Sequence, residues 1–433
     1  MIWEQLSNRP FCIYGAGIVA MSVYTAIEAL YDRRPLFFLI SDSEVLETEQ
    51  VQSSGDKFKK TNGIPIKKIS EWKMELQEYK LHSREQQSLE SLDPESNITI
   101  PELYFVAAPE IHHASIRKSL QELRIKDENI FLVTNRREND LMETYYSSLG
   151  SCRTVRSILL LNGTAQSPAN GNVYFDGIEN NVTGEKSKEF NWDNRFHEEG
   201  GICVYQAKSH MDKPLHRQYV LSEMPSYIFP IQVGSALTDQ TICDMQDNTG
   251  DNISAKNRNY CELTATYYVW KHSNAPYKGV CHYRRIFDMN DEQMYDLLKL
   301  ANNWDVILPY PSVHYPDLSM QHTRYVREDD WNAMLQALRE LEPEYLETYE
   351  KCILTGEKFF HNFNMLIAKA AVFDDYCSFL FRILARAEEL TTPKGWERAD
   401  RFAGYLGENL TTIYFLKNRV KWKIAYAGKI WLV

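Results

Sequence analysis

The chain has 433 residues, of which 44% are apolar, and a formal net charge of −11. This length exceeds what one compact core usually holds, so we expect two domains. The acidic balance, with no basic stripe before the C-terminus, argues against nucleic acid as a partner. The eight cysteines lack C-x-x-C or Cys/His ligand spacing, which excludes a zinc motif or a disulfide framework and indicates free thiols.

The composition also bears on location. The first ten residues are polar and lead directly into a strand, so we expect no signal peptide before Phe11. No uninterrupted apolar run approaches the length that crosses a bilayer. We therefore expect a cytoplasmic protein.

The N-terminal part predicts a Rossmann-like doubly wound domain over residues 1–140. A short apolar strand from Phe11 runs into G-A-G-I-V-A, and a helix and a second strand that ends at Asp42 follow. Further strands and a helix alternate through residues 103–134. One interpretation is a nucleotide pocket formed by Gly15, Gly17 and Asp42. The alternative is that the glycines only allow a tight turn from strand to helix.

Two polar regions interrupt this pattern. Residues 74–100 are charged and predict an exposed insertion that is helical in part. Residues 141–200 are rich in turn-forming residues, with one apolar, strand-like piece at 158–161, and predict an irregular connector.

The remaining residues, 201–433, predict a second α/β domain around a helix and a strand. Leu263, Tyr267 and Trp270 recur at the spacing of a buried helix face. A strand predicted over residues 280–287 then carries a histidine and two adjacent arginines, which are costly to bury unless an anion meets them. This pattern predicts either a site for phosphate or carboxylate or a structural ion-pair cluster.

Several motifs in the second domain resemble those of one family. They are P-I-Q-V-G at 230–234, G-D-N-I-S at 250–254, Y-C-E-L-T-A at 260–265 and C-H-Y-R-R at 281–285. Together they resemble a family of bacterial capsular and exopolysaccharide glycosyltransferases, several of which carry only a domain-of-unknown-function label. The resemblance covers residues 200–433. The first domain resembles the Rossmann-like module found beside many polysaccharide enzymes.

This resemblance implies a GT-A-like α/β fold and a transferase that uses a nucleotide sugar. It implies transfer of a hexose, of the galactose or galactofuranose type, from a UDP-sugar to a capsule or exopolysaccharide acceptor with inversion. The acceptor would be an oligosaccharide or carried on a membrane lipid, at the inner face of the cytoplasmic membrane. The resemblance places the following residues at the donor: Tyr205, Ala207, Lys208, Gln232, Asp251, Asn252, Lys256, Glu262, His282, Arg284 and Arg285.

The metal question stays open at this point. GT-A enzymes usually hold the donor diphosphate with a D-x-D pair and a divalent metal. Here His282 to Arg285 stand where that motif is expected, and guanidinium groups can stabilise a leaving diphosphate themselves. The alternative is that the arginines pair with Asp251 or Glu262. Asp247 and Asp251 also keep a site for Mn²⁺ or Mg²⁺ open.

The resemblance also suggests residues for catalysis and for the acceptor. Glu408 in L-G-E-N-L is the expected general base, with Asp400 in reserve. The alternative is that Glu408 only sits favourably at a helix N-terminus. His361, Asn362 and Asn364, at the entrance of a strand, are the expected acceptor or sugar contacts.

Two alternatives to a transferase remain: a non-catalytic carbohydrate-binding partner in polysaccharide assembly, and an enzyme that modifies nucleotide sugars through the first domain.

The C-terminal tail interleaves basic residues with Trp422, Tyr426 and Trp431. It predicts either peripheral contact with anionic lipid or a final strand packed on the domain.

Overall fold

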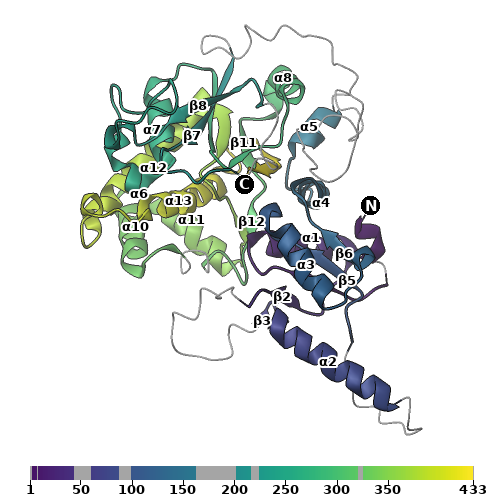
Figure 1. Cartoon of the computed structure of the whole chain (residues 1–433). Helices are drawn as coiled ribbons and strands as arrows, with labels where there is room; N and C mark the ends of the chain where they lie inside the picture. Colours follow the sequence, from purple (N-terminus) through teal and green to yellow (C-terminus); the bar gives the residue numbers. More distant parts are fainter. Residues whose placement is uncertain are drawn as a thin grey trace. The chain divides into compact units, whose positions relative to one another are not determined.

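The computed structural model describes residues 2–6, 8–42, 60–86, 99–161, 201–215, 224–319 and 325–432 (Figure 1). The chain divides into two compact units. The first unit comprises Met1–Tyr145 with Val313–Pro316, and the second comprises Tyr146–Ser312 with Asp317–Val433. Most of the predicted connector, residues 162–200, lies outside the described residues, so the predicted domain boundaries stay predictions.

The first unit is built on a six-stranded sheet in the order β3-β4-β2-β1-β5-β6. Its strands are β1 (Phe11–Tyr14), β2 (Phe38–Ile40), β3 (Lys60–Thr61), β4 (Ile64–Lys68), β5 (Leu103–Val106) and β6 (Ile130–Leu132). All neighbours are parallel except the β3–β4 hairpin. Strands β1 and β5 are buried along their whole length, as expected where helices cover both faces of a parallel sheet.

The helices of this unit alternate with its strands. They are α1 (Ile18–Tyr31), α2 (Ile69–Gln86), α3 (His113–Glu122) and α4 (Asn135–Ser148), which continues into the second unit. Part of the predicted polar insertion is helix α2, and residues 87–98 lie outside the described residues. The strand order reverses at β1, which is the doubly wound arrangement that the sequence predicted.

Gly15 occupies the point where β1 turns towards α1. Its φ is +119°, and a Cβ there would lie 2.5 Å from the carbonyl oxygen of Ala107. A Cβ at Gly17, in contrast, would meet no atom within 4 Å. Only the first glycine is therefore required by the backbone.

This contrast gives a prediction with a built-in control. Gly15→Ala should lower the free energy of unfolding of the first unit by about 2–3 kcal/mol, since the side chain clashes and the backbone is strained. Gly17→Ala should change it by less than about 0.5 kcal/mol. Chemical denaturation followed by circular dichroism measures both, and equal losses would contradict the steric explanation.

The second unit is built on a mixed sheet. Its main strands are β7 (Ile202–Lys208), β8 (Ile228–Gln232), β9 (Tyr277–His282), β11 (Val306–Pro309), β14 (Leu366–Lys369) and β15 (Ile424–Ala427), in the order β8-β7-β9-β14-β11-β15. All run parallel except β14, which is antiparallel to both its neighbours. The short strands β10 (Arg285–Phe287) and β16 (Lys429–Trp431) pair beside β9. Strands β12 (Ser312–Val313) and β13 (Phe359–Phe360) form a separate pair.

Helices cover both faces of this sheet (Figure 1). They are α5 (Val155–Leu161), α6 (Asn257–Tyr260), α7 (Leu263–His272), α8 (Asp291–Lys299), α10 (Glu328–Leu341), α11 (Pro343–Leu354), α12 (Ala370–Leu390) and α13 (Phe402–Asn418). One core joins the sheet to α7, α10, α12 and α13, and a second joins it to α5 and α8. The fold-class prediction, a Rossmann-like α/β unit followed by a GT-A-like α/β unit, is confirmed.

One element was predicted wrongly. The apolar piece at 158–161 is part of helix α5, not a strand. Val155, Ile158 and Leu159 enter the core together, at helical spacing. A four-residue apolar run is too short for periodicity to separate helix from strand.

Candidate functional site

The candidate site lies at the carboxyl edge of the second sheet. Strands β7 and β9 run parallel and end at Lys208 and His282, and the antiparallel β14 begins at the same edge, just after Asn364. Ligands of open α/β sheets bind outside the carboxyl ends of the strands. The topology therefore brings together three predicted site residues that are far apart in the sequence.

The two arginines occupy a tight turn and the strand after it. The predicted strand over 280–287 is broken: β9 ends at His282, and Arg285 pairs with His282 in the antiparallel strand β10. Tyr283 and Arg284 form the two-residue connection. Neither is a residue typical of such turns, which is why the sequence predicted one continuous strand.

Neither arginine forms a direct ion pair with a carboxylate of the described residues, although Glu408 and Glu262 act on Arg285 from a distance. Arg285 stacks between Phe363 and Trp431, with its guanidinium carbon 4.3 and 4.1 Å from the ring centroids. Arg284 lies 5.0 Å from the ring of Tyr283. Within the part of the chain that the structure describes, neither forms an ion pair, and the Nε atoms of both are buried without a hydrogen bond. The alternative of pairing with Asp251 or Glu262 is therefore not what the structure contains.

Glu262 links the arginine turn to the residues before β14. Its Oε1 accepts a hydrogen bond of 2.7 Å from Asn364 Nδ2, and its Oε2 lies 4.0 Å from His282 Nε2. Burial and the positive charges of Arg285 and Arg284 lower the pKa of His282 to about 2. His282 Nδ1 accepts the N–H of Arg284 (3.3 Å), so the neutral ring carries its proton on the nitrogen that faces Glu262.

Glu408 completes this cluster from helix α13. The helix begins at Phe402, so Glu408 lies in its second turn and not at the N-terminus that the sequence suggested. Its Oε1 accepts the backbone N–H of Phe363 at 2.8 Å. Burial and the nearby carboxylate of Glu262 raise its pKa to about 7, against the opposing effect of Arg285. A carboxyl group with this pKa can accept a proton near neutral pH.

This raised pKa predicts a pH-dependent stability difference. An acid whose pKa is higher folded than unfolded destabilises the fold as pH rises from about 4.5 to about 7. Gln does not titrate, so Glu408→Gln should be more stable than the wild type by about 3 kcal/mol at pH 8, and by less than about 1 kcal/mol at pH 5. Urea denaturation without ligand at both pH values measures this, and a pH-independent difference would contradict it.

Two charged residues that the sequence did not single out also reach the cluster. Arg401 precedes α13 and donates through Nε to Cys261 Sγ at 3.3 Å. Asp212 follows β7; burial raises its pKa to about 6 despite the charges of Arg284, Lys208 and Arg401. Both residues lie in polar loops without a distinctive spacing, so only the fold reveals them.

Backbone strain concentrates at the same place. Seven non-glycine residues of the described chain have a positive φ, and four of them belong to this cluster: Cys261, Phe363, Asn364 and Arg401. Such conformations cost about 1–3 kcal/mol each and persist where surrounding contacts impose them, often at functional sites.

Other predicted donor residues lie elsewhere or inside the sheet. Tyr205 and Ala207 are buried in β7, although Ala207 pairs in register with His282. Gln232 is buried and bonds to the backbone of Gln240 and Ile242. These buried residues stabilise the sheet and the loop beside the site.

The polar loop after β8 is held by local contacts. Asp251 is exposed; its side chain accepts from Tyr267 OH at 2.9 Å, in the middle of α7, and its carbonyl oxygen lies 2.9 Å from His272 Nε2 at the end of α7. Asn252 bonds within its own loop. Lys256 pairs with the buried carboxylate of Glu388 at 2.6 Å. These three predicted donor residues contact the loop, α7 and α12, and none forms a hydrogen bond or ion pair with Arg284 or Arg285.

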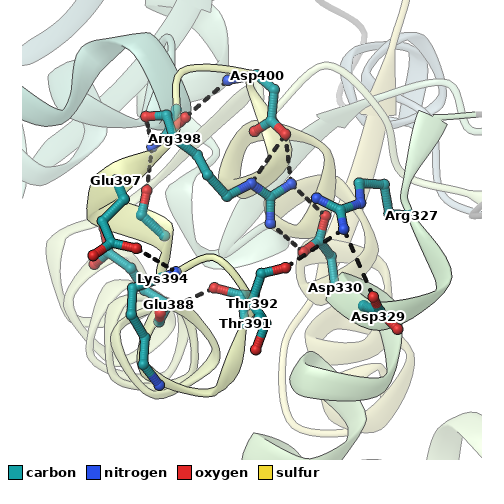
Figure 2. A network of polar contacts seen from close by, with 12 residues as sticks. Arg327, Asp329, Asp330, Glu388, Thr391, Thr392, Lys394, Glu397, Arg398 and Asp400 are labelled. Atoms are coloured by element: carbon teal, nitrogen blue, oxygen red, sulfur yellow. Dashed lines mark hydrogen bonds and ion pairs between the residues drawn. The ribbon is translucent and has the colours of Figure 1, made fainter.

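The remaining predicted catalytic and acceptor residues are also placed. Asp400 is exposed and accepts from Arg398 Nε at 3.0 Å, within the polar network of Figure 2. His361 is buried, 3.0 Å from Tyr426 OH, and burial lowers its pKa to about 4. Asn362 is buried beside it, with neither side-chain polar atom hydrogen-bonded to a described residue.

The carboxylates considered for a metal have other partners in the structure. Asp247 is fully buried and accepts the backbone N–H groups of Gly234 (3.0 Å) and Ser235 (3.1 Å) and the hydroxyl of Ser254. Asp251 lies apart from it, on the loop surface. Among the described residues, no group of three His, Cys, Asp or Glu side chains could hold a metal ion.

In the first unit, the predicted nucleotide residues have structural partners. Asp42 accepts the backbone N–H of Ser70 at 3.0 Å, in the first turn of α2. Gly15 makes the close approach to Ala107 described above. These contacts favour the interpretation that the glycine turn shapes the strand-to-helix connection, while Gly17 faces open space.

The C-terminal tail forms strands β15 and β16, the second of the two alternatives. Lys421 pairs with Asp375 at 2.9 Å, Lys423 donates to Asn302, and Trp431 stacks on Arg285. No helix in the described ranges is long and apolar enough to cross a membrane.

Comparison with known families and structures gives two similarities. Residues 214–419 match the model of a domain of unknown function, DUF4422. This agrees with the predicted resemblance to a family with such a label, over a shorter stretch than residues 200–433. The apo structure of the bifunctional glycosyltransferase WbbM aligns at 24% identity and a TM-score of 0.45, covering 53% of this chain and 45% of that chain. No curated protein matches.

Proposed function

We propose that the second unit is a glycosyltransferase that uses a nucleotide-sugar donor. The observation that carries this proposal is the pair of guanidinium groups, Arg284 and Arg285, without a carboxylate partner, next to the high-pKa carboxyl group of Glu408. Guanidinium groups at the carboxyl edge of an α/β sheet suit the diphosphate of a nucleotide sugar. A carboxylate that titrates near neutral pH suits the deprotonation of an acceptor hydroxyl.

The proposed reaction is a single displacement with inversion. The acceptor oxygen forms a bond to the anomeric carbon of the sugar while the bond from that carbon to the diphosphate oxygen breaks. Glu408 takes the hydroxyl proton, and the arginines stabilise the charge that develops on the leaving nucleoside diphosphate. Glu262, held by Asn364, keeps the proton affinity of Glu408 high.

The finer assignments belong to this proposal. The donor is a UDP-hexose of the galactose or galactofuranose type, and the acceptor is a growing capsule or exopolysaccharide chain, free or linked to lipid at the cytoplasmic membrane. These assignments derive from the motif resemblance. Incubating the protein with a panel of nucleotide sugars and measuring released nucleoside diphosphate tests the activity. Carbohydrate binding without turnover of any donor would instead favour a non-catalytic partner.

Chelation provides a separate test of how the diphosphate is held. Because the arginines stand at the donor edge and Asp247 is committed to backbone N–H groups, activity should largely survive excess EDTA. Initial rates before and after chelation measure this. Complete loss that manganese restores would show that residues outside this arrangement bind a metal.

A further inference from the structure

Arg401 is a third guanidinium group of this site without a carboxylate partner. Its Nε donates to Cys261 Sγ at 3.3 Å. Its terminal nitrogens form no hydrogen bond or ion pair with any residue in the described ranges. Arg386 and Arg398, in contrast, both pair with carboxylates. An arginine that is fixed through Nε while its two terminal nitrogens have no partner is arranged to bind an anion from solution.

The loop before α13 fixes the direction of Arg401. The backbone of Arg401 is left-handed, with a φ of +66°. Three residues earlier, the side chain of Arg398 is only 5% exposed. Its two terminal nitrogens donate to the two oxygens of the buried Asp330 carboxylate, Nη2 to Oδ2 at 2.7 Å (Figure 2). Asn259 adds a hydrogen bond to the carbonyl of Arg398 and accepts the N–H of Asp400. We call this set of contacts the Arg398 clasp.

Cys261 fixes the other side of Arg401. It has a φ of +51° and immediately precedes Glu262. A Cβ at Gly404 would lie 3.4 Å from Cys261 Sγ, so the first turn of α13 packs closely on the thiol. Burial raises the pKa of Cys261 to about 12, so the group beside Arg401 is a neutral thiol and does not cancel its charge.

The charge of Arg401 acts on the centre of the site. It lowers the pKa values of His282, Asp212 and Glu408, acting with Arg284 on the first two and with Arg285 on Glu408. Geometry agrees with this: Arg401 contacts Cys261, the next residue, Glu262, lies 4.0 Å from His282 Nε2, and His282 pairs with Arg285. Burial and the charge of Arg284 lower the pKa of Arg285 to about 10, against the opposing effects of Glu408 and Glu262. A polyanion bound at this turn would further offset the positive charge.

We propose that Arg401 is a third ligand of the donor's diphosphate, positioned by the Cys261 thiol and by the Arg398 clasp. This inference rests on the proposed function and extends it to a residue and a positioning loop that the sequence motifs do not contain. Arg401 contacts the donor, whereas Arg398 acts through Arg401.

Titration calorimetry with UDP and with uridine separates phosphate binding from base binding. Arg401→Ala should weaken UDP binding by about 10- to 100-fold, the loss of a charge-assisted contact, and leave uridine binding unchanged. Arg401→Lys should recover part of the affinity. Arg398→Ala should, like Arg401→Ala, weaken UDP binding more than uridine binding. Arg386→Ala is the control and should bind like the wild type, because Arg386 is a partly exposed residue of α12 that pairs with Glu340 and Glu389.

The outcomes distinguish this inference from the proposed function. If the wild type binds UDP and a folded Arg401→Ala variant binds it equally well, Arg401 is not a ligand and only this inference fails. If Arg398→Ala weakens UDP and uridine equally, the clasp has a general structural role and the positioning part fails. If the wild type does not bind UDP, both this inference and the proposed UDP-sugar donor fail.

Discussion

Glu408→Gln should lower turnover by about 10²–10⁴-fold while donor affinity stays nearly unchanged, which is the usual share of a general base. Gln has the same shape and can still accept the N–H of Phe363, so the fold is preserved while the proton acceptor is lost. Steady-state rates and donor affinity, measured on the same preparations, test this.

The pH dependence of the rate is a second test of Glu408 as the general base. With a pKa raised to about 7, the wild-type rate should rise with pH through neutrality and level off above it, since only the carboxylate accepts a proton. Asp400→Asn tests the reserve candidate, whose carboxylate is exposed and paired with Arg398, and should lower turnover far less than Glu408→Gln. A folded Glu408→Gln variant with near-normal turnover, or a collapse in Asp400→Asn instead, would move the base elsewhere.

Arg284→Ala and Arg285→Ala should each weaken donor binding or turnover by well over tenfold. Loss of a charge-assisted contact costs about 1.5–3 kcal/mol, which corresponds to about 10- to 150-fold. Arg285→Lys should not restore full activity, because an ammonium group cannot reproduce the planar stack between Phe363 and Trp431.

The control for these variants is Arg386→Ala, which removes an arginine from an exposed ion pair. Thermal melts verify folding, since Arg285 also fills space between two aromatic rings. Unchanged kinetics in folded Arg284→Ala and Arg285→Ala variants would remove the central support of the proposed function.

The sequence by itself indicated the α/β class of both units and several residues of the candidate site. The G-A-G turn between two apolar strands predicted the doubly wound start, because a strand-to-helix turn at Gly15 requires a residue that tolerates positive φ. His282, Arg284, Arg285 and Glu408 were selected because their charges are costly to bury without a partner, or because they stand in a motif.

The tertiary structure decided how those residues meet and which others join them. Local pattern placed Glu408 at a helix start and continued the strand through Arg284, yet packing set the helix start at Phe402 and folded the strand back after His282. Arg401 carries no sequence signal of its own. Its place depends on Cys261, 140 residues away, and on the burial of Asp330. Long-range contacts of this kind, and the pKa shifts that burial causes, exist only once the chain is folded.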